Sequence, residues 1–366
     1  MRARLEDVCE RGSSNLRQAD VAGRSGDYPI YGASGYIGNV DFYHQELPYV
    51  AIVKDGAGIG RTVLLPAKSS VIGTMQYLLP KKNVLPEYLC YVVRYMHLEK
   101  YFSGATIPHI YFRDYKSEEF NLVPVDYQEE IVATLGKIEA IVAARQRQLQ
   151  KLDELVKARF VEMFGDSEFN TMQWPTKKLS ELCAVSSSKR IYQNEQSTEG
   201  VPFLRISDLN ERIDNVKNAP ELFIPINKYN ELKENGLVPT EGDILVTSRG
   251  TLGRCYIVRP EDEFYFQDGM ISWLSDLNSQ ITSVYLSQLF AMSGIQKQIA
   301  SLQAGSTVAY LSITMVKKLN IMLPPLDRQE QFAAFVEQTD KSKVAVQKAL
   351  DEAQLLFDSL MQKYFG

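Results

Sequence analysis

The chain has 366 residues, 45% of them hydrophobic and 23% charged, with a formal net charge of −5 at pH 7. This length supports two hydrophobic cores, and the composition is that of an ordinary globular protein. The negative balance excludes a protein that binds DNA through overall basic charge alone, because neutralisation of phosphates by Lys and Arg supplies most non-specific affinity.

The N-terminal part of the chain, residues 1–125, is predicted to form a mixed lobe of short strands and at least one helix. Residues 28–38 are rich in glycine and aromatic side chains, which is typical of close strand turns. Strands are expected over residues 47–53 and 62–65, and a helix over residues 86–101.

Three glycines, Gly56, Gly58 and Gly60, lie between the two expected strands. Such a string resembles the turn that holds a pyrophosphate or S-adenosylmethionine, but that turn needs a helix directly after it. Here a strand follows, and the matching turn farther along the chain keeps only Gly250 and Gly253. We therefore predict a hairpin and no bound cofactor.

Residues 126–165 are predicted to form one long helix. Apolar side chains recur at alternating spacings of four and three, the seam of a coiled coil. The seam positions are Ile131, Leu135, Ile138, Val142, Leu149, Leu152, Val156 and Met163. The helix would be roughly 55 Å long at about 1.5 Å per residue, which indicates a spacer.

The rest of the chain repeats this arrangement. Residues Gln128 and Glu129 recur 201 positions later as Gln329 and Glu330, and residues 163–165 recur as 364–366 at the same offset. Farther upstream the offset shrinks, which indicates that loops differ in length while the framework repeats.

A second mixed lobe is accordingly expected over residues 166–326. Strands are predicted over residues 243–246 and 255–258, and a helix near residues 283–302. Residues 327–366 are predicted to form a second long helix with a weaker seam, which Thr339 and Lys343 interrupt.

Two long helices of equal length suggest an antiparallel arrangement. The first leaves one lobe and enters the other, so the second can bury its seam by returning antiparallel along the first. The lobes would then be related by a pseudo-twofold axis, the symmetry that dimeric DNA readers share with the duplex. Two unlike lobes would read an asymmetric, two-part site.

No catalytic or metal site is predicted. The three histidines, His44, His97 and His109, all lie in the first lobe, so no His-based site can occur in both copies. The four cysteines have no CxxC spacing and are expected to be buried, small apolar groups. His109 has Tyr310 or Ala309 as its counterpart, and such an exchange is what a variable base-reading position would show.

Direct readout of bases needs Arg, Lys, Asn, Gln, Ser or Thr on loops. The candidates in the first lobe are Ser34, Tyr36, Lys54, Arg61, His109 and Arg113. Those in the second lobe are Arg205, Ser207, Thr247, Ser248, Arg249, Arg254, Gln303, Ser306 and Tyr310. The turn with Arg249 is favoured because two hydroxyl residues precede a bidentate donor.

With the repeat in view, the chain resembles the specificity subunits of type I restriction-modification enzymes. The resemblance covers nearly the whole length and rests on the order of several motifs. These are YPIYGASGYIG at 28–38, VPFLRISDLN at 201–210, GDILVTSRGTLG at 242–253, the Leu-Pro-Pro-Leu-x-x-Gln-Glu entry at 323–330 and the two long helices.

The resemblance implies an α+β protein with two target-recognition domains in tandem, separated by an antiparallel pair of coiled-coil helices. The domains would be residues 1–125 and 166–326, and the spacer helices residues 126–165 and 327–366. Each domain would read one half of a split site in double-stranded DNA, and the helices would set the gap and dock two methyltransferase subunits.

The resemblance also implies that this chain is non-catalytic. S-adenosylmethionine and ATP would be bound only by partner subunits, the methyltransferases and, in complexes that restrict DNA, the translocating restriction subunits. The lobes are close to neutral, with 14 basic and 13 acidic residues in 1–125 and 15 and 18 in 166–326. Tight DNA binding would therefore need phosphate contacts from partners.

Two other classes remain open from the residues alone. A duplicated coiled-coil scaffold would bind no DNA even beside its partners, and a methyltransferase or nuclease fragment would be active when purified alone. No stretch reaches the roughly 18 to 20 apolar residues that span a membrane, and MRARLEDVCE does not resemble a signal peptide. A cytoplasmic location without membrane contact is expected.

Overall fold

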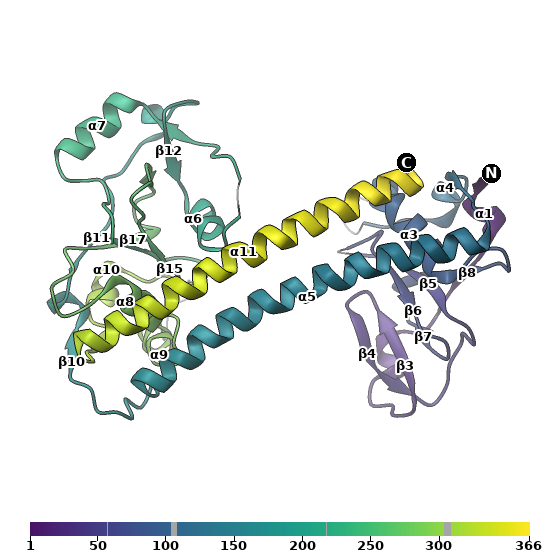
Figure 1. The fold of residues 1–366 in the computed structure, drawn as a ribbon, viewed down its shortest axis with the longest axis horizontal. Helices are drawn as coiled ribbons and strands as arrows, with labels where there is room; N and C mark the ends of the chain where they lie inside the picture. The colour runs from purple at the N-terminus through teal and green to yellow at the C-terminus, as the bar shows by residue number, and fades with distance from the viewer. Residues whose placement is uncertain (57, 104–107, 217, 304–308) are drawn as a thin grey trace. The chain divides into compact units, whose positions relative to one another are not determined.

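The structure is a computed structural model that describes residues 1–56, 58–103, 108–216, 218–303 and 309–366. The chain forms two compact units (Figure 1). Unit 1 comprises Met1–Arg147 and Val346–Gly366, and unit 2 comprises Gln148–Ala345. Both contain helices and short strands, which confirms the α+β class.

Unit 1 is built on a four-stranded antiparallel sheet in the order β2(Cys9–Ser13), β8(Met75–Pro80), β5(Tyr49–Val53), β6(Thr62–Leu65). All five residues of β5 are buried, as expected of a central strand. The helix α3(Pro86–Tyr95) packs against β5 and β6. The strands expected on either side of the glycine string are confirmed, with the first beginning two residues later.

Smaller elements complete unit 1. The segment 28–38 forms the predicted close turn, a hairpin of β3(Tyr28–Gly32) and β4(Gly35–Val40) that pairs with β7(Ser70–Val71). The remaining short elements are α1(Leu5–Val8), α2(Gln18–Val21), α4(Phe112–Tyr115) and the pair β1(Arg2–Arg4) and β9(Glu119–Asn121).

Both predicted lobe helices are interrupted. In unit 1, α3 ends at Tyr95, His97 adopts a left-handed conformation with φ of 50°, and a 3₁₀ turn follows at η1(Leu98–Tyr101). In unit 2, Met292 is extended and separates α8(Ser283–Phe290) from α9(Ser293–Leu302). One non-helical residue breaks the hydrogen-bond ladder in each case, although the apolar pattern continues.

Unit 2 repeats the sheet of unit 1. Its antiparallel order is β11(Ala184–Ser186), β17(Ile271–Ser275), β14(Ile244–Thr247), β15(Cys255–Ile257), with the fully buried β14 in the place of β5. The two strands expected around residues 243–258 are therefore confirmed.

Unit 2 also contains elements that its sequence did not reveal. A second sheet has the order β13(Phe223–Ile224), β12(Val201–Leu204), β16(Tyr265–Phe266), and carries α6(Ile206–Ile213) and α7(Ile226–Glu234) beside it (Figure 1). The shorter elements are β10(Thr176–Lys178) paired with β18(Asn320–Met322), α10(Ile313–Lys317), η2(Leu179–Glu181) and η3(Gln193–Glu195).

The two longest helices are α5(Val125–Phe164) and α11(Leu326–Phe365), each of 40 residues (Figure 1). In unit 2 the end of α5 packs on the start of α11, with the rings of Phe160 and Phe164 5.5 and 5.4 Å from that of Phe332. In unit 1 the start of α5 and the end of α11 share one core. The buried residues that the two long helices contribute to it are Ile131, Leu135, Ile138, Phe357, Met361 and Phe365.

A buried glutamine explains the repeated Gln-Glu motif. The amide of Gln128 accepts a hydrogen bond from Leu85 N–H at 2.9 Å and donates to the carbonyls of Asn83 and Val123 at 3.0 and 2.9 Å. Gln329 makes the same three bonds, with Thr282 N–H and the carbonyls of Gln280 and Pro324, all at 2.9 Å. Each glutamine is fully buried and joins a long helix to its lobe.

The cysteines are free thiols. Cys9, Cys90 and Cys183 are buried as expected, and Cys255 is half-buried. Burial raises the pKa of Cys9, Cys90 and Cys183 to about 12, so these groups stay protonated and unreactive near neutral pH. None of the described helices combines the length and apolar character that crossing a bilayer requires.

Candidate nucleic-acid interface

The glycine turn follows the central strand in both units; we use this name for residues 54–61 of unit 1 and residues 248–254 of unit 2. Two backbone hydrogen bonds close each turn in the same way. In unit 1, Val53 N–H donates to Arg61 O at 3.0 Å and Gly60 N–H donates to Val53 O at 2.9 Å. In unit 2, Thr247 N–H donates to Arg254 O and Gly253 N–H to Thr247 O, both at 2.9 Å. The predicted hairpins are confirmed.

Glycine is required where each turn closes. Gly60 and Gly253 have φ of 81° and 77°, in the left-handed region. A Cβ at Gly60 would lie 2.6 Å from the backbone N of Glu99, and one at Gly253 would lie 2.7 Å from Ile299 Cδ1. The repeated glycine therefore has a local structural cause.

Two further segments hold each turn. On one side, the N–H of Lys54 donates to Thr74 O at 3.0 Å, as that of Ser248 does to Met270 O at 2.9 Å. On the other side, Ile110 N–H donates to Lys54 O at 3.0 Å, and Leu311 N–H donates to Ser248 O at 2.9 Å. The two units thus share one backbone frame around the turn.

Different side chains stand on this common frame. Asp55 is bridged to His109 in unit 1, and Arg249 is bridged to Tyr310 in unit 2. The structural counterpart of His109 is therefore Tyr310, which decides between the two alternatives left by the sequence. In unit 1, His109 Nδ1 forms a short contact with the Asp55 carboxylate, so the residue facing this histidine is acidic where unit 2 has an arginine.

Arg249 and Tyr310 are accessible in unit 2. Arg249 is exposed, with Nη1 3.8 Å from Met270 Sδ, and the Tyr310 side chain is 40% exposed. The Gln303 amide accepts from Tyr310 N–H at 2.8 Å and also donates to Tyr310 O, so it holds this residue in place. An exposed guanidinium on a rigid turn can donate two parallel hydrogen bonds to a planar acceptor such as a guanine edge.

A second group of candidates lies together in unit 1. The Tyr111 ring is 4.2 Å from that of His109, and the Arg113 guanidinium lies 4.6 Å above Tyr111. The hairpin turn with Ser34 is tied to the same frame, because Ala33 N–H donates to Thr74 Oγ1 at 3.3 Å. Other exposed candidates include Tyr36, whose hydroxyl donates to Asn39 Oδ1 at 3.0 Å.

Two of the arginine candidates in unit 2 form ion pairs with acidic residues of the same unit. Arg254 pairs with Asp214 and donates to Asn210 Oδ1 at 2.9 Å, which joins the turn to α6. Arg205 pairs with Asp208 at 3.3 Å and with Glu221 at 2.6 Å. Nearby, Ser207 Oγ donates to Asp208 at 3.1 Å. These groups have partners within unit 2, and their contact with DNA stays a prediction.

The arginines that close the two turns also differ in their surroundings. The carbonyls of Arg61 and Arg254 accept equivalent backbone bonds, but Arg61 N–H donates to Gly58 O whereas Arg254 N–H donates to Thr247 Oγ1. The Arg61 side chain is exposed and lines a cavity of about 950 Å³. Unlike Arg254, Arg61 forms no ion pair with any residue that the structure describes. Lys54 has its ammonium 3.9 Å from Asp55. Ser306 lies outside the described residues.

The prediction that Thr247 and Ser248 contact DNA is corrected by the structure, because both side chains are buried. Thr247 Oγ1 donates to Thr251 O at 2.5 Å and accepts from Arg254 N–H at 3.0 Å, while Ser248 Oγ bonds Ser272 Oγ at 2.8 Å. Their hydroxyls hold the turn and do not reach its surface.

We expect Thr247→Val to lower the free energy of unfolding by about 1–3 kcal/mol, because the turn loses a buried hydroxyl with two partners. Valine fits the frame, since Val53 has this position in unit 1. Urea unfolding would measure the loss, with Thr251→Val on the exposed side of the same turn as control. Equal stability of both variants would contradict the structural role.

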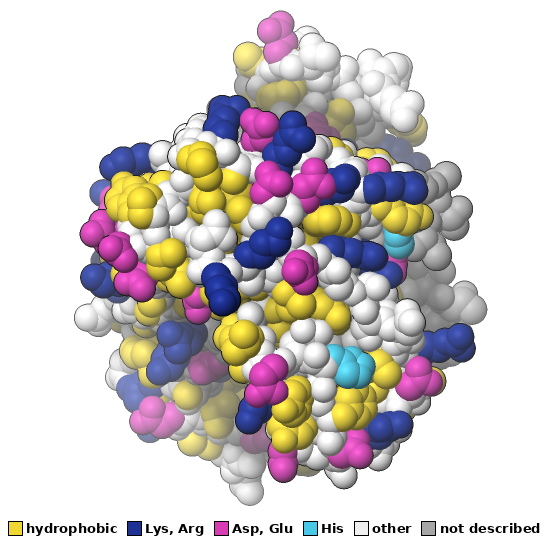
Figure 2. All heavy atoms as spheres, turned by 90° about the vertical axis from the view of Figure 1, so that its right-hand side faces the viewer, with side chains coloured by type: hydrophobic (Ala, Val, Ile, Leu, Met, Phe, Trp, Pro, Cys, Tyr) yellow, Lys and Arg dark blue, Asp and Glu magenta, His cyan; other side chains and the backbone are white. Residues whose placement is uncertain are grey.

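Charges are mixed on the face that Figure 2 shows. Figure 2 shows one face on which Lys and Arg side chains alternate with Asp and Glu, without a large patch of one sign. Among the described residues, no group of three or more His, Cys, Asp or Glu side chains is arranged to hold a metal ion.

Comparisons with known proteins agree with this repeated architecture. A family model described as the type I restriction modification DNA specificity domain matches residues 1–154 and 172–353. A putative type I restriction enzyme specificity subunit of Haemophilus influenzae is 23% identical over 93% of this chain and 86% of its own length. The MjaVIII specificity subunit of Methanocaldococcus jannaschii is 23% identical over 82% of this chain and 76% of its own length.

Two solved structures show a similar fold. The S subunit of a type I restriction-modification system from M. genitalium has a TM-score of 0.61 at 16% identity, covering 100% of this chain and 96% of that chain. A chain from a structure on complex assembly and conformational transition of a type I R-M system has a TM-score of 0.52 at 14% identity, covering 100% and 97%.

Proposed function

This chain belongs to the type I restriction-modification DNA specificity family, and we propose that each of its units reads one half of a bipartite, asymmetric DNA site. The observation that carries this proposal is the shared backbone frame with unlike side chains. Asp55 and His109 in unit 1 stand where unit 2 has Arg249 and Tyr310. A backbone frame that is the same in both units, with different polar side chains on its turn, supports two recognition domains that prefer different DNA sequences.

The long helices are proposed to be the spacer between these readers. In unit 2 the end of α5 packs on the start of α11, and in unit 1 the start of α5 shares a core with the end of α11. Both observations support an antiparallel pair. As tandem target-recognition domains and spacers, we propose the boundaries 1–125, 126–165, 166–326 and 327–366.

The partners are proposed to be double-stranded DNA and two methyltransferase subunits that dock on the helices. Neither lobe has the excess of basic residues that would bind a duplex tightly alone. The methyltransferases would add phosphate contacts and supply S-adenosylmethionine, and restriction subunits would use ATP. The chain itself would contribute recognition and no catalysis.

Arg249→Ala tests the proposal. We expect the assembled complex to lose about 1–3 kcal/mol of discrimination at one base pair, roughly 5- to 150-fold, because a bidentate contact to one base is removed. Methylome sequencing of cells that express the chain with its methyltransferase subunits would show one degenerate position in one half of the site. Arg259→Ala is the matched control, since this exposed arginine follows the other end of β15.

Relaxation in both halves of the site, or in neither, would contradict the assignment of Arg249. Failure of the assembled wild-type complex to bind any specific duplex would favour the scaffold over the DNA reader.

A further inference from the structure

A second segment borders the glycine turn in both units. It follows the first strand of the main sheet, over residues 14–17 in unit 1 and 187–192 in unit 2. Gly73 N–H donates to Leu16 O at 2.7 Å, and Gly269 N–H donates to Ser187 Oγ at 3.1 Å. These glycines directly precede Thr74 and Met270, whose carbonyls hold the turn. The bordering segment is therefore part of the repeated frame.

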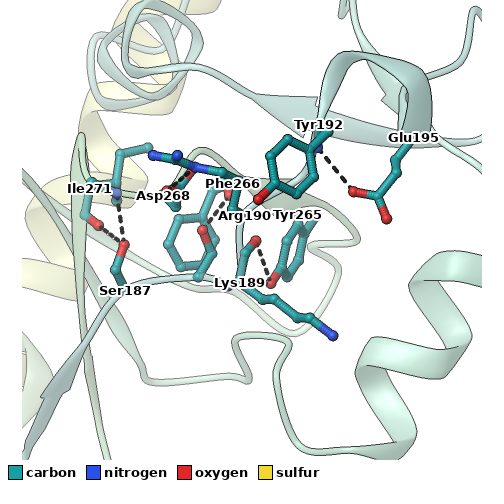
Figure 3. Close-up of polar contacts among 11 residues, drawn as sticks. Ser187, Lys189, Arg190, Tyr192, Glu195, Tyr265, Phe266, Asp268 and Ile271 are labelled. Atoms are coloured by element: carbon teal, nitrogen blue, oxygen red, sulfur yellow. Dashed lines mark hydrogen bonds and ion pairs between the residues drawn. The ribbon is translucent and has the colours of Figure 1, made fainter.

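Unit 2 anchors its segment 187–192 by several hydrogen bonds (Figure 3). Ser187 Oγ donates to Ile271 O at 3.0 Å, and Ser188 Oγ donates to Phe266 O at 2.7 Å. The backbone N–H of Lys189 donates to the Tyr265 hydroxyl at 2.8 Å. The backbone is thus held on β16 and β17, so little conformational entropy remains to be lost when a ligand binds.

The side chains of this segment differ from its backbone in their exposure. Lys189 and Arg190 are exposed, and Tyr192 is 61% exposed. Arg190 Nε donates to Asp268 Oδ2 at 3.0 Å while its side chain stays 64% exposed. In Figure 3 the Lys189 ammonium points away from the labelled contacts. It forms no ion pair with a described residue, although its charge acts on the Glu195 carboxylate.

The segment is connected to the turn through residues 268–270. Asp268, which orients Arg190, lies two residues before Met270, whose sulfur contacts Arg249. Arg190 is thus linked through residues 268–270 to the turn that carries the exposed arginine, and Lys189 is its neighbour in the chain. In unit 1, the equivalent segment has Asn15 and Arg17 exposed.

We propose that residues 187–192 are a second DNA contact of unit 2, which binds backbone phosphate beside the base pair read by Arg249. This inference rests on the proposed function and extends it to a different chemical group of the same ligand. Ammonium and guanidinium groups on a fixed backbone bind phosphate oxygens without reading sequence, and such contacts set the register of a base reader. Residues 14–17 are the corresponding contact in unit 1.

Lys189→Gln in the complete complex with its methyltransferase subunits is the test. We expect affinity to fall by a similar factor for the specific duplex and for unrelated duplexes of equal length. The slope of log K against log salt concentration should become shallower by about 0.9, the value for one phosphate contact. The methylated sequence should stay the same, and Lys189→Arg should restore the slope.

Lys318→Gln is the matched control, because this exposed lysine follows α10 beside the β10 and β18 pair. It should change neither affinity nor slope. An unchanged slope for Lys189→Gln, alongside a relaxed sequence for Arg249→Ala, would overturn this inference and leave the proposed function standing. Loss of subunit assembly, measured by sedimentation without DNA, would also overturn it, because the segment would then contact protein.

Discussion

Exchange of residues 1–125 for the equivalent segment of a relative with another specificity should replace one half of the methylated DNA sequence and leave the other half unchanged. We expect the recognised sequence of that half to change entirely, because the whole glycine turn of unit 1 and the segments that hold it are exchanged together. The turn of unit 2 keeps all of its own supports, from Met270 to Leu311.

The structure indicates why such an exchange should fold. Gln128 on α5 bonds backbone groups of the lobe, namely Asn83 O, Leu85 N–H and Val123 O. Backbone partners do not depend on the identity of the exchanged side chains. The apolar contacts to α5 are less tolerant, because packed cores respond to changes in volume. A donor with similar residues at 88–92 is therefore preferred.

Methylome sequencing of cells that express the hybrid with its methyltransferase subunits provides the measurement. The reciprocal exchange of residues 166–326 is the control and should alter only the other half. A hybrid that folds and assembles but changes both halves, or neither, would refute independent reading by the two units.

Gln329→Leu should lower the free energy of unfolding by about 3 kcal/mol or more. The fully buried amide makes three hydrogen bonds to backbone groups. Leucine has a similar volume but leaves Thr282 N–H and the carbonyls of Gln280 and Pro324 without this partner. Each buried group left unpaired costs about 1–3 kcal/mol.

Urea unfolding followed by far-UV circular dichroism would measure this loss. Gln338→Leu is the control on the same helix, since Gln338 is exposed, and it should leave the midpoint nearly unchanged. Gln128→Leu should destabilise unit 1 to a similar extent. A midpoint for Gln329→Leu equal to that of Gln338→Leu would show that the buried amide does not hold the lobe to α11.

Much of the framework could be predicted because it depends on local patterns. The spacing of apolar residues marked both long helices, and the repeat placed equivalent strands and turns in the two halves. The same patterns missed the breaks at His97 and Met292, since an apolar series continues through a single non-helical residue. They also missed α6 and α7, for which unit 1 has no equivalent helix within residues 28–53, and the sheet of β12, whose order and strand directions match those of β4, β3 and β7 in unit 1.

The candidate site was predicted only in outline. The glycine pattern located the turns, and the two hydroxyl residues before a bidentate donor favoured the turn with Arg249, which the structure leaves exposed. Asp55 was not recognised as the partner of His109, because the offset of 193 between Gly60 and Gly253 places it opposite Ser248, whereas the structure places it opposite Arg249. Lys189 and Arg190 had no signal beyond two basic residues after a run of serines.

The amino-acid sequence by itself determined the duplication, the two long helices, the hairpin turns and the class of side chain on each turn. Only the tertiary structure decided which of those side chains remain available to a ligand. Thr247 and Ser248 are buried, Arg205 and Arg254 are paired, and Arg249 is exposed, although all five are polar residues near turns. The exposure of a side chain depends on segments that are distant in sequence, such as α6, which packs near Arg254. A polar group that already has hydrogen-bond partners within the protein is less available to DNA.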